Sequence, residues 1–592
     1  MSPTLSLLLA ASLLLPAGEG TSTPKGESPF PLAKVKSGMR GHMKTVLRGT
    51  TIERFDLEVI DVLPRYLPRQ DVVLVRLEGK SSVTGQDIGH IGILHGMSGS
   101  PVYLQDPDDG EWKCLGALAY GFSGFPKDPI AGITPLESML RERDRPLSPS
   151  LLAGGSADPS PSPPPPGKPG GGFAAGLRPL ATPLFLSGFS PRAAAFLAQE
   201  FEPRGISVVQ GGGGTYDPGR KIEIEPGGSI GVQLMRGDLD ATGTGTVTWR
   251  DGDSVLAFGH PMVQGGEWPM PVTSAWVHTV VADLNYAYKL SSPVAQAGSL
   301  LRDQQSAILC QIGRSPPLVP FDLHVRNSRT GWKEDYSVEV VRHPGFTTGL
   351  LMSALLSCAE SAEPVTGFAT VRSKIRIELA GRREPIELED LGVLNSGVAS
   401  PMMVAAVPRL LQNPFGRVEI RRVEADVEVV PERRTAEIQA AWTDVNEVEA
   451  GRDVTLSVVL RPYDRPDEKV NVTFRLPANL PPETYEIEVG AGRTTEPDAP
   501  EPKNVEDLLR WLKSQYLSSD LVTVVELGTI GTKQEGKSLR KLPFSVFGTL
   551  LSSASAGVTI APDTLRVVTR TGYVLAGKKS VRIKVKNTGG GQ

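Results

Sequence analysis

Alternating apolar and polar positions predict a mainly β fold for most of this chain. Residues 55–63 are rich in apolar side chains, and 72–77 form a short apolar run typical of a buried strand. Beyond residue 424, apolar residues recur at every second position in 454–458 and 470–476, and again around Ile487 and Ile583. Successive side chains of a strand point to opposite faces, so this spacing predicts half-buried antiparallel strands of a small β-sandwich.

One helix and one linker stand out from the predicted strands. Asn504 can cap a helix whose apolar residues, from Val505 to Tyr516, share one face. Residues 146–172 contain PSPSPPPPGKPGGG. Proline lacks a backbone N–H group and glycine costs backbone entropy, so this stretch predicts a semi-rigid linker and not a core element.

The N-terminus indicates export. An apolar run from Leu5 to Leu15 is too short to span a bilayer, but it fits the hydrophobic part of a secretory signal. Residues 21–28 are polar, as expected for the start of a mature chain. The alternative is that the run is a buried strand or helix. We expect a secreted or cell-envelope (periplasmic) protein without a transmembrane segment.

Composition excludes several classes of function. The chain has 62 basic and 66 acidic residues and a net charge of -4, which argues against a broadly basic nucleic-acid binder. Its three cysteines are far apart in sequence, without a CxxC pair, and its seven histidines include no HExxH motif. These features argue against a disulfide-dense fold, a Cys-rich zinc site and an HExxH zinc peptidase. We therefore expect neither a metal nor a cofactor.

The sharpest chemical motif is GMSGSP at 96–101. A nucleophilic serine needs a tight turn and backbone N–H groups that face the developing oxyanion. Glycines on both sides of Ser98 allow that approach, with a strand-like lead-in at 91–94 and a strand at 102–104. We expect Ser98 to be the nucleophile and the N–H groups of Gly96 and Ser98 to form the oxyanion hole. The alternative is a plain Gly/Ser hairpin loop.

A serine nucleophile needs a base, which is most often histidine. His260 follows an apolar strand at a Gly-His-Pro turn, where a rigid sheet can present a catalytic side chain. His42, in a glycine-containing turn, is the other possibility. We interpret the remaining histidines as exposed or structural: His90, His95, His278, His324 and His343.

Four segments carry a family resemblance. GILHGMSGSPVYLQ, LGALAYGF, DPIAGITPLESML and GTGTVTWRDGDSVLAFGHPM resemble the SpoIVB peptidase family, and the resemblance covers about residues 35–380. It implies a chymotrypsin-like double β-barrel with Ser98 as nucleophile and His260 as base. The serine segment here precedes the histidine segment, the reverse of the family's order, so we expect a permuted domain. Triads are defined by geometry and not by chain order.

The resemblance leaves the acid open. The family's Asp falls on Val83 in this chain. Glu78 is the nearest carboxylate in an equivalent setting, before a Thr-Gly pair that resembles the family's, and we expect it to complete the site. Asp87 and Asp303 are the alternatives, as is a Ser–His dyad or an inactive site.

The expected function is that of an exported serine endopeptidase that cleaves protein or peptide substrates. Self-cleavage in the linker or just after the signal peptide is also expected, and the strand at 121–125 should line the substrate groove. The alternative is a non-catalytic envelope binding or scaffold protein with a degenerate protease core.

These patterns divide the chain into six expected parts. They are a signal peptide (1–20), the serine half of the protease (35–143), the linker (144–172), the histidine half (173–424), a β-sandwich-like domain (425–500) and a C-terminal helix plus β region (501–592).

Overall fold

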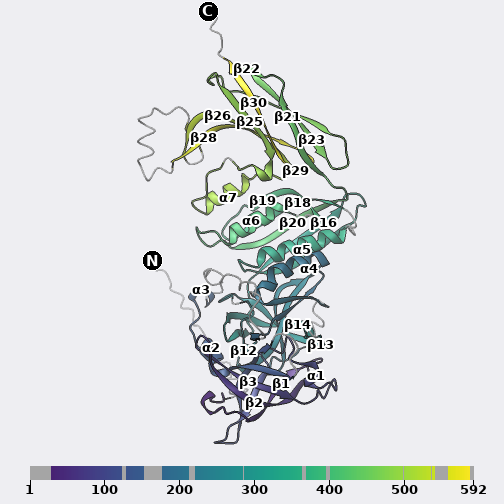
Figure 1. Ribbon diagram of the computed structural model, residues 1–592, viewed down its shortest axis with the longest axis vertical. Helices are drawn as coiled ribbons and strands as arrows, with labels where there is room; N and C mark the ends of the chain where they lie inside the picture. The colour runs from purple at the N-terminus through teal and green to yellow at the C-terminus, as the bar shows by residue number, and fades with distance from the viewer. Residues whose placement is uncertain are drawn as a thin grey trace, which may run out of the picture.

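The computed structural model describes residues 28–586 apart from several short stretches. The stretches left out are 123–127, 153–175, 213–220, 264, 284–285, 363–367, 395–399, 498, 535–536 and 540–557. The expected signal peptide and residues 153–172 of the expected linker therefore lie outside the described residues. From bottom to top, Figure 1 shows two barrels, a layer of sheet and helices, and a C-terminal sandwich.

The first barrel is a closed ring of strands in the order β1-β2-β3-β6-β5-β4, in which β4 pairs with both β5 and β1. Apolar side chains of β2, such as Phe55, Leu57 and Val59, alternate into its core, as the sequence pattern predicts. The strands are β1 (Arg40–Val46), β2 (Ile52–Leu67), β3 (Gln70–Glu78), β4 (Pro101–Gln105), β5 (Trp112–Phe122) and β6 (Ile130–Pro135).

The second barrel repeats this topology. Its ring runs β10-β11-β12-β15-β14-β13 and closes through the β10–β13 pairing. In both rings the fourth strand lies beside the first, as in a Greek key. The strands are β10 (Ser229–Gly237), β11 (Asp240–Asp251), β12 (Ser254–Ala257), β13 (Met270–Val281), β14 (Tyr288–Gln304) and β15 (Ala307–Ile312). The mainly β, double-barrel fold predicted from the sequence is thereby confirmed.

The two barrels share a buried interface. One apolar cluster joins Tyr103 and Ala117 of the first barrel to Trp249 and Leu256 of the second. Helix α2 (Leu136–Arg143), which follows the first barrel, contributes to the same cluster. The serine-bearing and histidine-bearing segments are therefore packed as one unit.

Short elements surround the barrels. The edge strand β7 (Leu177–Pro179) pairs with β5, and β8 (Thr182–Ser187) pairs with β11 and with β9 (Ile206–Gln210). The short helix α1 (Ile88–Ile91) precedes the serine motif. Another short helix, α3 (Pro149–Leu152), follows α2.

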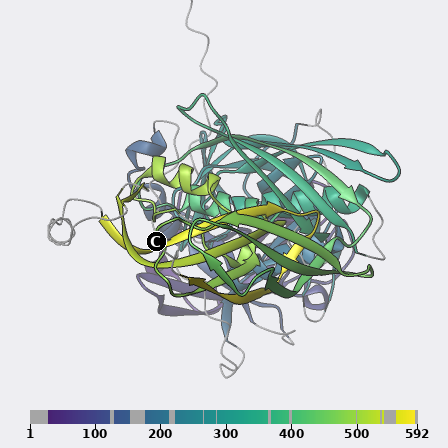
Figure 2. The same cartoon turned by 90° about the horizontal axis from the view of Figure 1, so that it is seen from above.

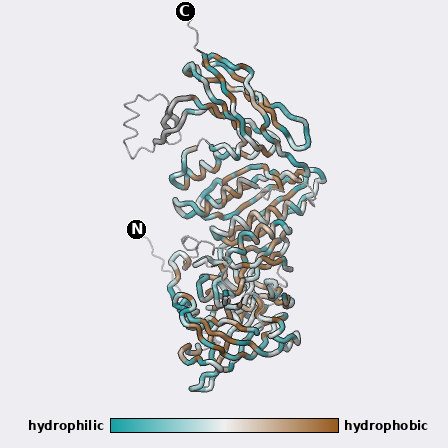
Figure 3. The backbone as a smooth tube through the Cα atoms, viewed as in Figure 1, coloured by the Kyte–Doolittle hydropathy of each residue, from teal (hydrophilic) through white to brown (hydrophobic). Residues whose placement is uncertain are grey.

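Above the barrels, a second layer continues the sheet of the second barrel through the β10–β17 pairing. Its strands are β16 (Leu318–Asn327), β17 (Lys333–Val341), β18 (Thr370–Leu379), β19 (Ile386–Val393) and β20 (Ile420–Val430). Its helices are α4 (Pro191–Phe201), α5 (Thr347–Ala362) and α6 (Pro401–Leu411). Helix α5 is apolar along most of its length (Figure 3). Most of its residues are buried. The expected boundary at 424 falls inside β20, which pairs with β16 and β18.

The C-terminal region is one β-sandwich, seen from above in Figure 2. One sheet contains β21 (Thr435–Thr443), β23 (Asp453–Pro462), β24 (Glu468–Arg475) and β29 (Val574–Ala576). The other contains β22 (Glu447–Glu449), β25 (Thr484–Ala491), β26 (Asp520–Gln534), β27 (Lys537–Leu539), β28 (Val558–Arg570) and β30 (Lys578–Lys586).

Residues on both sides of the expected boundary at 500 belong to this one sandwich. Strand β25 pairs with both β26 and β30, and the two sheets enclose a single core. The predicted helix is present as α7 (Val505–Lys513), and the Asn504 side chain accepts a hydrogen bond from the Asp507 N–H group.

Candidate active site

The serine loop, residues 96–101, connects the third and fourth strands of the first barrel. Its lead-in is the short helix α1 and an irregular segment, which corrects the strand-like lead-in expected at 91–94. Gly96 and Gly99 have φ angles of +89° and +97°, a region that favours glycine. A Cβ atom on Gly99 would lie 1.9 Å from the Thr246 carbonyl oxygen. The loop therefore rests directly on β11 of the second barrel.

Two threonines of β11 fix the serine loop. The Thr246 N–H group donates to the Ser98 carbonyl at 2.8 Å, and the Thr246 hydroxyl donates to the Gly96 carbonyl at 3.0 Å. The Thr248 hydroxyl donates to the Gly99 carbonyl at 2.8 Å. A loop of one barrel is thus held in shape by a strand of the other.

The reactive groups of the serine loop are buried and unpaired. Ser98 is fully buried, and its Oγ atom has no hydrogen-bond partner among the described residues. The N–H groups of Gly96 and Ser98 also have no acceptor among the described residues. A nucleophile and the donors of an oxyanion hole need this kind of unsatisfied group.

The histidine loop, residues 258–269, connects the third and fourth strands of the second barrel. Phe258 and Gly259 have φ angles of +71° and +72°, so the chain turns sharply at the end of β12. The Thr134 hydroxyl of β6 donates to the Gly259 carbonyl at 2.6 Å. A Cβ atom on Gly259 would lie 2.6 Å from the Ala117 Cβ atom of β5. The turn that carries His260 is therefore seated against the first barrel.

The hydrogen bonding of His260 fixes its tautomer. Nδ1 lies 2.7 Å from the Pro261 carbonyl oxygen, which can only accept, so Nδ1 carries the proton. Nε2 is buried without a partner and is left with a lone pair. Burial is the main cause that lowers the pKa of His260 to about 4, with a small contribution from His95. The neutral ring can accept a proton at Nε2.

The serine and histidine loops meet at the interface between the barrels. The Phe258 N–H group lies 2.6 Å from the Cβ position of Gly99, next to Ser98. Since Ser98 Oγ and His260 Nε2 both lack a hydrogen-bond partner, they are not hydrogen-bonded to each other in this conformation. The structure thus brings together the loops of the nucleophile and base expected from the sequence.

Two of the expected acids lie in other surroundings. Glu78 is half-buried at the end of β3 and forms an ion pair with Arg40 at 3.1 Å. Asp87 caps α1 by accepting a hydrogen bond from the Gly89 N–H group at 2.8 Å. The structure gives neither carboxylate a contact with the His260 ring, which corrects the preference for Glu78.

Asp303 is a carboxylate that accepts hydrogen bonds from the backbone of the histidine loop. It is buried at the end of β14 and accepts hydrogen bonds from the N–H groups of Met262, Val263 and Gly265, at 2.8, 2.7 and 3.2 Å. These residues follow His260 directly in the chain. Asp303, the more distant alternative in the sequence, therefore fixes the backbone that follows His260.

His42, the alternative base, lies within β1 and not in a turn. Its buried ring stacks on Tyr103 and meets the edge of Trp112. These contacts give His42 a packing role in the first barrel.

Sequence reasoning missed Lys289, the second residue of β14. Its side chain is fully buried, and Nζ lies 3.3 Å from the Thr45 hydroxyl and 3.1 Å from the Thr246 hydroxyl. The surrounding sequence, AYKLSS, contains no motif. A lysine at a buried strand position cannot be told from an exposed one until the strand register is known.

A covering segment, residues 177–183, crosses the site. In it, Arg178 pairs with Gly121 of β5, and the Leu180 N–H group donates to a β5 carbonyl at 2.9 Å. The Ala181 carbonyl accepts a hydrogen bond from His95 Nδ1 at 2.9 Å. Pro183 lies 3.7 Å from the Cβ position of Gly96. The covering segment therefore lies antiparallel to β5 and beside the serine loop.

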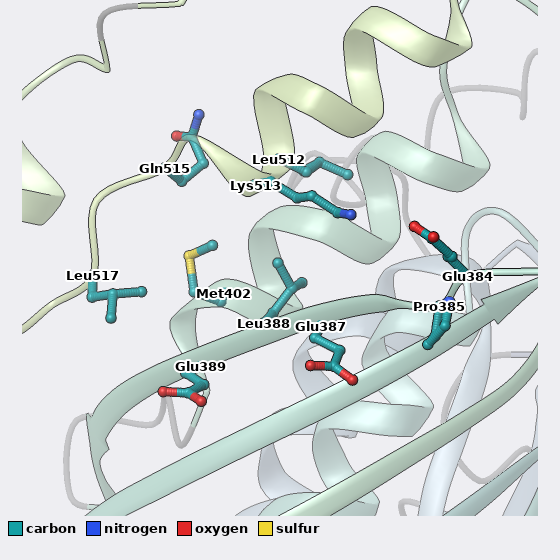
Figure 4. A pocket seen from close by; sticks show the side chains of 10 residues that line it. All are labelled: Glu384, Pro385, Glu387, Leu388, Glu389, Met402, Leu512, Lys513, Gln515 and Leu517. Atoms are coloured by element: carbon teal, nitrogen blue, oxygen red, sulfur yellow. The ribbon is translucent and has the colours of Figure 1, made fainter.

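Two cavities lie outside the site. One of about 510 Å³ lies between β19, α6 and α7 (Figure 4), and includes Glu387, Glu389 and Lys513 in its lining. Another of about 420 Å³ lies beyond the histidine loop and is bounded in part by Trp268 and Arg342. Neither is lined by Ser98, His260 or Asp303.

No family model, curated protein or solved structure matches this chain. Among the described residues, no helix is long and apolar enough to cross a membrane.

The close contact between the barrels at Gly99 predicts that Gly99→Ala strongly lowers the free energy of unfolding. Gly110 also has a positive φ, +76°, but a Cβ atom there meets nothing within 4 Å. Backbone strain alone should make Gly110→Ala cost about 1–2 kcal/mol. In Gly99→Ala the added Cβ atom also clashes with the backbone of Thr246. The free energy of unfolding should therefore fall by at least about 3 kcal/mol. Urea denaturation measures both, and equal costs would show that the serine loop does not depend on this contact.

Proposed function

We propose that this chain is an exported serine endopeptidase of the SpoIVB type, which cleaves peptide bonds in protein substrates. One observation carries the proposal. The serine and histidine loops are the same connection, from third to fourth strand, in two barrels of identical strand order, and they meet at one interface. The N-terminal apolar run supports a secreted or periplasmic location.

The chemistry assigns one role to each group. Ser98 Oγ attacks the substrate carbonyl, and His260 Nε2 accepts its proton and later passes it to the leaving amine. The N–H groups of Gly96 and Ser98 hold the oxyanion of the tetrahedral intermediate. Asp303 holds the histidine loop, so it orients the base through the backbone.

The covering segment supports a peptide as the substrate. It lies extended and antiparallel along β5, which is how proteins bind an added strand. Leu180 packs on Gly121, where the missing side chain leaves room for an apolar group. A substrate peptide would take the same path. Of the groove strand expected at 121–125, residues 123–125 lie outside the described residues.

A binding or scaffold protein with a degenerate protease core is the second candidate. The absence of a Ser98–His260 hydrogen bond and the covered site favour it. Apo hydrogen bonds between catalytic groups often tighten only when substrate binds, so this geometry is compatible with an enzyme. Reaction with a fluorophosphonate probe distinguishes the two candidates.

Fluorophosphonate labelling should depend on all three groups. Ser98→Ala and His260→Gln should each abolish labelling, and the double variant should behave like either single variant, because the groups act as a unit. Asp303→Asn should slow labelling by roughly 10²-fold or more. Glu78→Gln tests the acid expected from the sequence and should label at the wild-type rate. Circular dichroism must show intact folding, and an unlabelled wild type would leave the scaffold protein as the answer.

The labelling rate should stay constant down to about pH 5. A protonated imidazole cannot accept the serine proton, so the rate falls as the pH drops through the pKa of His260. Because burial lowers that pKa to about 4, the acid limb should lie well below the ordinary value of 6.5. His95, the titratable group that contributes to this shift, is also neutral in the range, since burial lowers its pKa to about 4. A half-maximal rate near pH 6.5 would contradict a buried, neutral base.

Self-cleavage should map to the chain between the barrels. The covering segment follows the linker in sequence and lies beside the serine loop, so its peptide bonds are candidates for cleavage. Purified protein should fragment slowly at a site within 144–183, and Ser98→Ala should stay intact under the same conditions. Intact-mass analysis locates the cut. Equal fragmentation of both proteins would assign the cut to a contaminating protease.

A further inference from the structure

Lys289 is an unusual residue to find at this interface. Its amine is fully buried, and burial alone lowers its pKa to about 7. None of the described carboxylates forms an ion pair with it. Burial of an unpaired amine costs free energy of folding, so a packing role alone would be better served by an apolar side chain.

A chain of hydroxyls leads from Lys289 to the serine loop. Ser100 Oγ lies 2.6 Å from the Met97 carbonyl oxygen and 3.0 Å from Thr45 Oγ1. A carbonyl can only accept, so the single Ser100 hydroxyl hydrogen points to Met97. The Thr45 hydroxyl therefore donates to Ser100, and Lys289 Nζ, 3.3 Å from Thr45, donates to Thr45. The relay ends on the Met97 carbonyl.

The Met97 carbonyl belongs to the same peptide unit as the Ser98 N–H group. A trans peptide is planar, with its C=O and N–H bonds pointing in opposite directions. Fixing the carbonyl from one side therefore aims the N–H group at the other. Hydrogen bonding at the carbonyl also polarises the unit and strengthens its donor.

The backbone of Lys289 acts on the other expected donor in the same way. Its N–H group donates to the His95 carbonyl at 3.0 Å. That carbonyl shares a peptide unit with the Gly96 N–H group. The side chain and the backbone of one residue thus hold, from the carbonyl side, both peptide units that provide the oxyanion hole.

We propose that Lys289 is the positioning residue of the oxyanion hole, acting through Thr45 and Ser100 on the Ser98 N–H group and through its own backbone on the Gly96 N–H group. This inference rests on the proposed serine peptidase function. It concerns the stabilisation of the oxyanion and not the affinity for the bound probe or peptide.

The test separates the bond-forming step from binding by measuring the maximal labelling rate and the half-saturating concentration of a fluorophosphonate probe. Lys289→Met and Thr45→Val should each lower the maximal rate roughly tenfold to a hundredfold and leave the half-saturating concentration unchanged. Thr45→Ser keeps the hydroxyl and should restore the rate. The double variant of Lys289→Met and Thr45→Val should lose no more than either single variant, because both break one relay.

Thr242→Val is the matched control. It removes a buried hydroxyl of β11 that donates to the Asp240 carboxylate at 2.6 Å and makes no hydrogen bond to the serine loop. It should slow labelling by less than about threefold. In urea at pH 7, Lys289→Met should be as stable as the wild type or more stable, because an apolar group replaces a buried amine.

The possible failures are distinguishable. An unlabelled wild type refutes the peptidase function, and the inference falls with it. A labelled wild type with an unchanged Lys289→Met rate refutes the inference alone, as does a loss no larger than that of Thr242→Val. If Lys289→Met does not fold, the Thr45→Val and Thr45→Ser pair decides, since both variants keep the lysine.

Discussion

The close approach of the serine loop to β11 is the contact on which the rest of the site depends. At Gly99 the backbone of one barrel touches the backbone of the other, and no side chain could be accommodated between them. Hydrogen bonds from Thr246 and Thr248 then fix the loop at three carbonyls. The histidine loop makes the reciprocal contact, with Gly259 seated against β5. Neither barrel contains a site by itself, so any change that separates the barrels removes the loop geometry before it unfolds either core.

The two barrels show how a fold can repeat without a repeat in the sequence. Strand order depends on which edges pair and which faces are apolar, and many sequences satisfy both conditions. Ser98 and His260 occupy the same connection in their respective rings, although the surrounding residues differ. Because each ring contributes its own third-to-fourth connection, the order of the halves along the chain does not matter to the geometry at the interface.

The sequence predicted what short-range patterns control. Strands follow from alternation, the helix after Asn504 from its cap and apolar face, and the position of His260 from a strand that ends at Gly-His-Pro. The apolar run at 91–94 was expected to be a strand, but it is the end of a short helix and an irregular segment. A short apolar run does not distinguish a strand from other structure. Asp303 was ranked below Glu78 because distance along the chain does not show which carboxylate a strand register brings to a loop. Lys289 left no signal, since its role depends on burial and on partners from β1 and β11.

The covering segment has a consequence for how any external peptide reaches the serine. An occupant that is part of the same chain acts at an effective concentration on the order of millimolar, whatever the protein concentration. Hydrogen bonds to β5 and to His95 hold this segment in place. Under the proposed function, a free peptide would compete with this segment, and dilution would not remove the competition. A substrate would have to displace Leu180 and its neighbours, and a cut in the chain beside them would relieve the competition for the whole life of the molecule.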